Sequence, residues 1–190
     1  MEDNFDALVA AIADGARKAF LSLFQNGEHY YYCTLIFTGD GFGPNLSAFS
    51  WEALERVALH YAEQGSADTI KKLKSDLQWS WADSPYCSFK EEYFVAARDL
   101  VGARRFVDDF SDDETGYEEW ARELNLRLRA CEAALKMLDR EEIFSKNQLR
   151  NSIIIVAEYP TPSEEAAEIA ARLNPYSCLL KKYINYASDT

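Results

Sequence analysis

The residues best suited to acid–base chemistry are two histidines, because imidazole exchanges protons near neutral pH. His29 opens a predicted strand, and His60 lies in a predicted helix between Leu59 and Tyr61. Neither has a cysteine, a serine elbow or a second metal ligand beside it in the sequence, so no triad and no metal site are indicated. We expect a surface or capping role for both histidines, and we predict no catalytic residue, no metal and no cofactor.

A glycine-rich segment has the composition of a phosphate-binding loop, with Gly39, Gly41 and Gly43 at alternate positions. It lacks the lysine of a P-loop and the spacing of a dinucleotide fingerprint, and no helix is predicted to begin directly after it. Glycines in a turn between two strands explain the segment without a ligand.

An acidic run spans residues 108–119. A calcium-binding EF-hand loop needs a central glycine and oxygen ligands at alternating positions, but Gly116 comes too late and Phe110 occupies a ligand position. Two interpretations remain, namely a solvated loop that places negative charge at a helix start, or an interaction patch for a basic partner. The candidate residues of this patch are Asp108, Asp109, Asp112, Asp113 and Glu114.

The most unusual local feature is a segment that contains two tryptophans, an acid and a tyrosine. Its candidate residues are Trp79, Trp81, Asp83 and Tyr86. Such side chains can wall a ligand cleft or form the centre of a protein interface. They can equally belong to a loop that packs on the core, with the ring N–H and O–H groups bonded to backbone.

The composition is that of a packed globular protein with a large excess of negative charge. Of 190 residues, 48% are hydrophobic, and 32 acidic residues oppose 20 lysines and arginines, which gives a formal net charge of −12. The densest basic stretch is only Lys71, Lys72 and Lys74, so we expect neither nucleic acid nor an anionic membrane as a partner. The charge favours a cationic protein partner, although solubility alone also explains it.

Neither export nor membrane insertion is indicated. Residues 1–6 have no basic region followed by an apolar one, so no signal peptide is predicted. The longest apolar runs, 30–37 and 153–157, are far shorter than the roughly 18 residues of a membrane helix. The cysteines stand singly, as free thiols do in a reducing compartment, which favours a cytoplasmic protein. They are Cys33, Cys87, Cys131 and Cys178.

The elements that must position these residues follow from hydrophobic spacing and helix caps. Helices are predicted at about 5–24, 51–61, 68–77, 94–110 and 116–140, with a last one from about 161 that Asn174 and Pro175 end. Strands are predicted at 30–37, 46–49 and 153–157, and segment 79–86 is predicted to be a loop or a short edge strand. Ser50 is predicted to cap the helix at 51–61, and Thr115 with Glu118 is predicted to form a capping box at the start of the helix at 116–140. This long helix has Trp120 on its predicted buried face and is roughly 36 Å long at 1.5 Å per residue, enough to cross the whole domain.

This order of elements does not alternate regularly between strand and helix. It favours an α+β fold over a doubly wound sheet. We predict one globular domain over residues 1–190, with a small, mostly antiparallel sheet that is covered by several helices, including the long one.

Short motifs spread over nearly the whole chain make it similar to a known family. They are Ala16-Arg17-Lys18-Ala19-Phe20, the tyrosine-rich strand with its glycine-rich turn, Leu77-Gln78-Trp79-Ser80 with Asp83 and Tyr86, Leu138-Asp139, Ile143-Phe144, the strand at 153–156, and Leu173-Asn174-Pro175. In this order they resemble the bacterial family catalogued as domain of unknown function 4303 (DUF4303). The central motif of that family reads Trp-x-x-x-Asp-Trp-x-Tyr-His. This chain has Ser84 and Cys87 where the second tryptophan and the histidine would stand, so it lacks any chemistry of that histidine.

The resemblance implies little chemistry, because that family has no established activity. Its members are small intracellular proteins, comparable by analogy with immunity proteins that neutralise toxins by binding them. We therefore expect a protein-binding, immunity- or antitoxin-like module whose acidic surface contacts a basic toxin. The alternative is a small-molecule-binding or enzymatic domain with a pocket around segment 79–86. A third hypothesis is self-association through an apolar face of the first or last helix.

Overall fold

The protein is described by a computed structural model that covers residues 2–37, 43–104, 114–146 and 148–188, without the side chains of residues 2, 3, 114 and 115. Its α-helices are α1 (Glu2–Leu23), α2 (Trp51–Glu63), α3 (Ile70–Leu77), α4 (Val95–Gly102), α5 (Glu114–Arg140), α6 (Glu164–Leu173) and α7 (Cys178–Ser188). Its strands are β1 (Tyr30–Ile36), β2 (Asn45–Ser50) and β3 (Ile154–Glu158). Three short 3₁₀ helices are η1 (Phe24–Asn26), η2 (Glu91–Phe94) and η3 (Arg150–Ser152).

The helices surround one small sheet, whose strand order is β2-β1-β3. The α+β class predicted from the sequence is therefore confirmed. β1 pairs antiparallel with β2 and parallel with β3, which makes the sheet mixed rather than mostly antiparallel. A parallel neighbour needs a long crossover connection, and here the whole segment from α2 to α5 supplies it. Every residue of β1 is buried, as its apolar character on both faces predicts.

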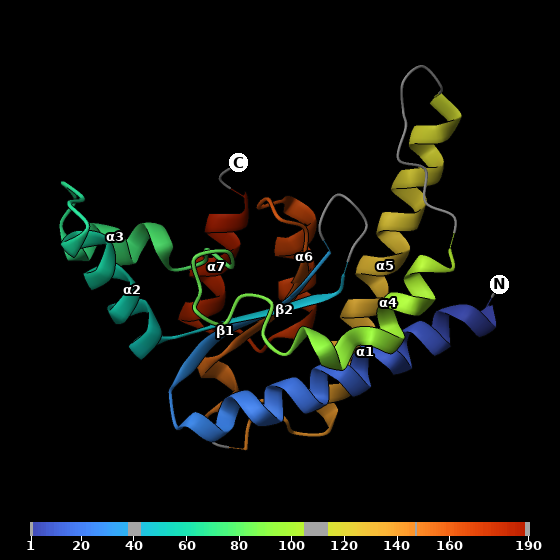
Figure 1. Cartoon of the computed structure of the whole chain (residues 1–190), viewed down its shortest axis with the longest axis horizontal. Coiled ribbons are helices and arrows are strands. Elements are labelled where there is room, and N and C mark those ends of the chain that lie inside the picture. Colours follow the sequence, from blue (N-terminus) through green and yellow to red (C-terminus); the bar gives the residue numbers. More distant parts are fainter. Residues whose placement is uncertain (1, 38–42, 105–113, 147, 189–190) are drawn as a thin grey trace.

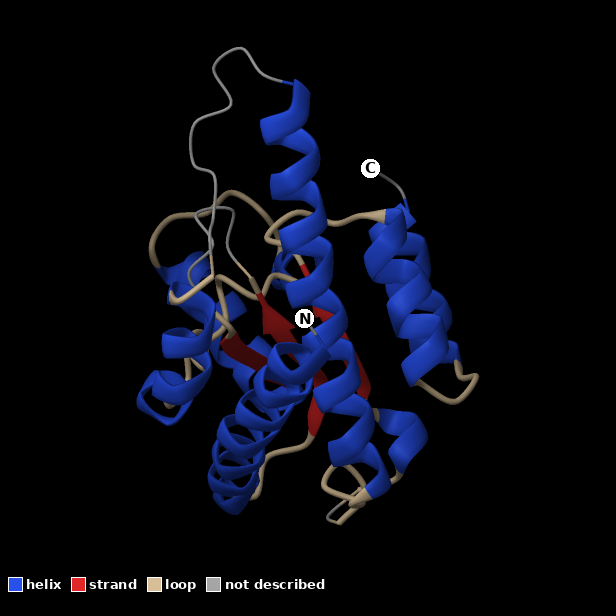
Figure 2. Cartoon of the chain, turned by 90° about the vertical axis from the view of Figure 1, so that its right-hand side faces the viewer, coloured by secondary structure: helices blue, strands red, loops and turns tan. Residues whose placement is uncertain are grey.

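The helices lie around this sheet in separate groups. α5 passes in front of the sheet in Figure 2, and α6 and α7 form a pair beside it. α1 crosses α5 at the base of the molecule, while the first turns of α5 project beyond the other helices (Figure 1). The α2–α3 pair lies on the opposite side from α5 (Figure 1).

α1 packs through the apolar stripe predicted from its spacing, and Leu8, Ile12 and Phe20 are fully buried. The Phe20 ring meets Phe144 edge-on with 5.0 Å between ring centroids. Gly15 faces η2 so closely that a Cβ atom there would lie 2.7 Å from the Tyr93 carbonyl oxygen, so a side chain at this position would push η2 away.

The free edge of β3 is closed by the end of α6. The Asn174 side chain accepts a hydrogen bond from the Ile155 amide at 2.9 Å and donates one to the Ile155 carbonyl at 2.7 Å. Arg150 holds Asn174 in turn, at 3.1 Å, and also bonds Asp139 at the end of α5. These contacts satisfy backbone groups that an open sheet edge would expose.

The structure corrects three predictions about elements. The helix predicted at 94–110 ends at Gly102, and residues 105–110 lie outside the described residues. α6 begins at Glu164 rather than 161, because Ser163 accepts a hydrogen bond from the Ala166 amide as the N-cap and Pro162 precedes that cap. α7 is not predicted at all, since Asn174 and Pro175 end one helix without excluding another.

In the part of the chain that the structure describes, none of the helices combines the length and hydropathy that crossing a bilayer requires.

Candidate functional site

Of the four candidate residues in segment 79–86, Trp79 belongs to the core. It is 5% exposed, and its indole packs edge-on against the rings of Tyr32 and Tyr183, with ring centroids 5.6 Å and 5.3 Å away. The segment is a series of turns, in agreement with the loop interpretation. Trp79 therefore joins β1 to α7.

The other three candidates of this segment point to three separate places. The Trp81 indole donates a hydrogen bond to the Pro160 carbonyl at 3.0 Å, next to the end of β3. Asp83 accepts one from the Tyr61 hydroxyl of α2 at 2.6 Å. Tyr86 belongs to a polar cluster at the other end of the sheet, described below. The four side chains thus do not converge on one pocket.

The acidic candidates fall largely outside the described residues. Asp108, Asp109, Asp112 and Asp113 lie in the segment 105–113, and Glu114 is the first residue of α5, without a described side chain. The capping box predicted on Thr115 also lies outside the described side chains. The patch predicted on this run stays a prediction.

A buried carboxylic acid lies beside Trp79, at the end of β3. Glu158 is only 4% exposed, and it accepts hydrogen bonds from the Tyr183 hydroxyl at 2.5 Å and from the Tyr32 hydroxyl. Burial raises the pKa of Glu158, and the two tyrosine hydrogen bonds oppose that rise without cancelling it. Burial likewise raises the pKa of each tyrosine, so both remain phenols.

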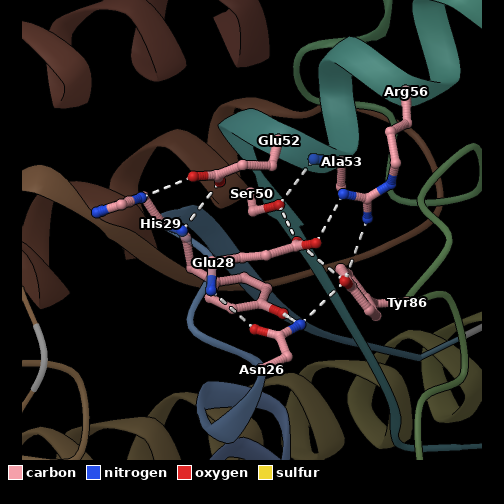
Figure 3. Close-up of polar contacts among 9 residues, drawn as sticks. Asn26, Glu28, His29, Ser50, Glu52, Ala53, Arg56 and Tyr86 are labelled. Carbon is pink, nitrogen blue, oxygen red and sulfur yellow. Dashed lines mark hydrogen bonds and ion pairs between the residues drawn. The ribbon is translucent and has the colours of Figure 1, made fainter.

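A polar cluster lies at the amino end of β1, and its side chains point toward one another (Figure 3). The Glu28 carboxylate accepts hydrogen bonds from Ser50 and, at 2.9 Å, from Tyr86, and it forms an ion pair with Arg56 at 2.7 Å. Ser50 is the N-cap of α2, as predicted, because it accepts a hydrogen bond from the Ala53 amide at 2.9 Å. Burial alone raises the pKa of Glu28, but the bonds from Ser50, Arg56 and Tyr86 outweigh it and lower the pKa.

His29 stands at the rim of this cluster. Its Nδ1 atom lies 2.6 Å from the Glu52 carboxylate, and its backbone amide donates to the same carboxylate at 3.0 Å (Figure 3). A carboxylate that orients a histidine is part of a catalytic triad. Ser50, however, is fully buried and already bonded to Glu28 and Ala53, so it is not free to act as a nucleophile beside His29.

The cavity next to the polar cluster is small. It has a volume of about 120 Å³, and its walls include Glu28, His29, Phe24 and Phe144. That volume holds about four water molecules. The groups of the polar cluster are bonded to one another, and they connect η1, α2 and the loop that contains Tyr86 to the start of β1. We therefore interpret the polar cluster as structural.

A larger groove lies at the opposite, carboxyl end of the parallel strands. It has a volume of about 490 Å³ and lies between α5 and the connection from β3 to α6. Its apolar walls include Trp120 and Leu124 of α5 and Tyr159, and its polar groups include Glu165 of α6 and Asn125 of α5. In open sheets with parallel strands, ligands bind outside the carboxyl ends of those strands. We refer to this site as the α5–α6 groove.

The electrostatics of the α5–α6 groove are dominated by carboxylates. Burial raises the pKa of Glu165; the charge of Arg172 opposes this rise, whereas Glu168 and Glu132 add to it. Arg172 is itself engaged by Glu132 in a two-bond pair at 2.9 Å, so its charge is shared. The Asn125 amide donates to Glu165 at 3.3 Å.

More acid lies along the same side of α5. Glu118, Asn125 and Glu132 are spaced by seven residues, which places them on one face of the helix. Glu118 pairs only loosely with Arg122 at 3.7 Å, and both side chains are exposed. Tyr117, which is 59% exposed, and Trp120 lie one turn apart with their rings tilted and 5.8 Å between centroids.

The groove residues were not among the candidates from the sequence, which placed Trp120 on the buried face of a helix. One signal was available, because Tyr159 and Pro160 directly follow a core strand and two acids open the next helix. A strand end before a helix start is where open sheets form sites. Among the described residues, no group of three histidine, cysteine, aspartate or glutamate side chains is arranged to hold a metal ion.

The chain is similar along most of its length to one protein family. A family model described as Domain of unknown function (DUF4303) matches residues 12–175, a range that contains both the polar cluster and the α5–α6 groove. No curated protein and no solved structure gives a significant match.

Proposed function

Because the chain belongs to the DUF4303 family, whose description assigns no function, we propose a function from the residues themselves. The protein is a protein-binding module of the immunity- or antitoxin-like kind, and it presents an acidic surface to a basic protein partner such as a toxin. The observation that carries this proposal is the α5–α6 groove, which is hydrophobic inside and surrounded by carboxylates. An apolar centre with a charged rim is typical of protein interfaces.

The aromatic residues of the groove supply the apolar centre. Tyrosine and tryptophan are enriched among the residues that dominate binding energy, because they bury a large area at a low entropy cost. Trp120 and Tyr159 line this groove and are partly exposed, and Tyr117 is exposed one turn of α5 before Trp120. The projection of α5 beyond the other helices makes this face accessible to a large partner (Figure 1).

The acidic rim determines which charge the partner's surface should carry. The whole chain carries a net charge of −12, and Glu118, Glu165 and Glu168 concentrate part of it around the groove. Complementary charge speeds association and rejects partners of the wrong sign more than it adds affinity. A basic surface is therefore the best complement.

The proposal places the protein in the cytoplasm. Its cysteines are free thiols, with Cys33 and Cys131 buried and Cys178 exposed. An exposed thiol stays reduced in the cytosol. A partner toxin would then be neutralised in the cell that makes the protein.

The test is capture of the partner, followed by a salt series. The tagged full chain is expected to recover one stoichiometric basic protein from a lysate of its source. Its Kd should weaken at least about tenfold between about 50 mM and about 500 mM salt, because salt screens exposed charges. Recovery of no stoichiometric protein, or a Kd indifferent to salt, contradicts the proposal.

Charge reversal provides the matched comparison. Glu118→Lys should weaken binding about fivefold at low salt, since a like charge then meets the basic partner. Glu63→Lys makes the same change of charge at an exposed acid at the end of α2, on the far side of the molecule (Figure 1), and should change the Kd less than about twofold. Equal effects of both substitutions would argue for net charge alone.

A small-molecule role is the second candidate, and the volume of the groove favours it. Ligand sites usually enclose about 300–1,000 Å³, a range that contains the α5–α6 groove. Trp81, a candidate from the sequence, lies at its margin through the bond to Pro160. Saturation-transfer NMR with a fragment library tests this role. Fragments that bind the wild type but not the Trp120→Ala variant would support a ligand site, and fragments that bind both equally would contradict it.

A further inference from the structure

The Glu165 carboxylate lies in a setting that favours a cation of particular shape. It lines the α5–α6 groove together with the apolar Leu124 and the aromatic rings of Trp120 and Tyr159. Among the described residues, Asn125 donates a hydrogen bond to this carboxylate at 3.3 Å, which is long for a charged acceptor. Burial keeps the pKa of this carboxyl group raised, although the charge of Arg172 opposes the rise.

Arg172, whose positive charge acts on Glu165, is already paired with another carboxylate. Arg172 lies on the same face of α6, seven residues after Glu165, but both of its bonded nitrogens contact Glu132 at 2.9 Å. Glu168, on that same face, adds a further negative charge, and it lies 3.6 Å from Arg172. The carboxylates around the groove therefore exceed the cations that compensate them.

We propose that the α5–α6 groove is an arginine site, in which the guanidinium of a partner's arginine pairs with Glu165 while its methylenes pack against Trp120 and Tyr159. The inference rests on the proposed function, and it names the side chain that the basic partner inserts. The contact is favourable because the guanidinium compensates the negative charge of a partly buried carboxylate.

Arginine fits this groove better than lysine for two reasons. Its planar guanidinium can donate two parallel bonds to one carboxylate, whereas an ammonium group is a point charge. It also packs against aromatic faces and is less strongly hydrated, so it loses less on entering a groove with apolar walls. An apolar side chain would leave the Glu165 carboxylate desolvated and without a partner.

The first experiment uses the full chain and a defined probe, N-acetyl-arginine amide. Two-dimensional NMR should show shifts confined to residues 120–125 and 159–165 and to the Trp120 indole N–H. N-acetyl-lysine amide should bind more weakly, and the uncharged N-acetyl-norleucine amide should produce no saturable shift. Arginine and norleucine probes of equal affinity, or shifts spread over the acidic surface, overturn the inference.

Two variants then separate pairing from general attraction. Glu165→Gln should weaken the arginine probe about tenfold, the loss expected for one charge-assisted contact. Glu164→Gln removes an exposed acid one residue away that does not line the groove, and it should change the affinity less than about twofold. Equal losses in the two variants would mean long-range attraction and would overturn the site.

The outcome for the partner protein is distinguishable from the outcome for the groove. If a captured partner binds Glu165→Gln and Trp120→Leu as well as it binds the wild type, the arginine site is wrong while the proposed function stands. If the probe binds at Glu165 but no partner is captured at any salt concentration, the site stands and the proposed function fails. Unchanged amide spectra outside the groove verify that each variant is folded.

Discussion

The two ends of the central strand pair both carry glutamates, but these glutamates are compensated differently. At the amino end, Glu28 receives bonds from Ser50 and Tyr86 and an ion pair from Arg56, all on the same chain. At the carboxyl end, Glu165 receives one long bond from Asn125. The first carboxylate is satisfied by folding, whereas the second is the one that we propose a partner's arginine satisfies.

The pKa shifts of these two carboxyl groups have opposite signs for the same reason. Burial raises the pKa of both, but at Glu28 the hydrogen bonds of its neighbours outweigh burial and the result is a lowered pKa. At Glu165 burial prevails, although Arg172 opposes it. A compensated carboxylate stabilises the fold, whereas a carboxylate with a raised pKa gains from any cation that reaches it.

Two of the tryptophans, Trp79 and Trp120, show the same contrast. Trp79 is enclosed by Tyr32 and Tyr183 and serves the core. Trp120 lines the open groove between α5 and the end of β3. The tryptophan that stands out in the sequence is thus structural, and the one that looks like an ordinary core residue lies at the candidate site.

The largest expected effect on stability comes from the amino end. Glu28→Gln should lower the free energy of unfolding by about 2 kcal/mol, because it removes the charged acceptor of two hydroxyls and the partner of Arg56. Urea denaturation followed by tryptophan fluorescence measures the change.

The same substitution at the carboxyl end provides the control. Glu165→Gln should change the free energy of unfolding by less than about 0.5 kcal/mol, since it removes a poorly compensated charge rather than a network. Equal destabilisation by both substitutions would end the contrast between the two regions.

A smaller effect, visible mainly as a pH dependence, is expected at Glu158. Its folded pKa is raised by burial, so the folded state binds a proton more tightly than the unfolded chain does. The stabilisation from that proton is present below the unfolded pKa of glutamate, about 4.3, and it is lost as the pH rises through the folded pKa.

Glu158→Gln should remove this dependence. The wild type minus variant difference in unfolding free energy should fall with rising pH by at most about 1.4 kcal/mol per pH unit, the limit for one proton. Urea titrations at several pH values measure it, and taking the difference cancels the groups that both chains share. A difference that stays constant with pH would mean that Glu158 titrates normally in the fold.

The elements set by local chemistry could be predicted from the sequence. Ser50 caps α2 because its hydroxyl satisfies the unpaired backbone amide three residues later. β1 is buried because its residues are largely apolar on both faces of the strand. The parallel pairing of β3 with β1 was missed, since a strand's direction depends on the path of the chain between the two strands rather than on its own residues.

The α5–α6 groove was missed for a related reason. Its walls come from residues 120–125 and 159–165, which only the packing of α5 beside β3 and α6 brings together. The sequence prediction assigned Trp120 to a buried stripe because the spacing fits, but spacing does not tell where a helix outgrows the body that it covers. α5 projects in this way at its first turns (Figure 1).

The smallest expected effect lies at the rim of the polar cluster, where His29 pairs with Glu52 in solvent. His29→Ala should lower the free energy of unfolding by less than about 0.5 kcal/mol, because the histidine side chain is 73% exposed and exposed pairs gain little. Glu52 would also keep its bond from the backbone amide of residue 29. A loss near 2 kcal/mol in the same urea assay would show that the polar cluster extends to His29, and that its rim is as structural as its centre.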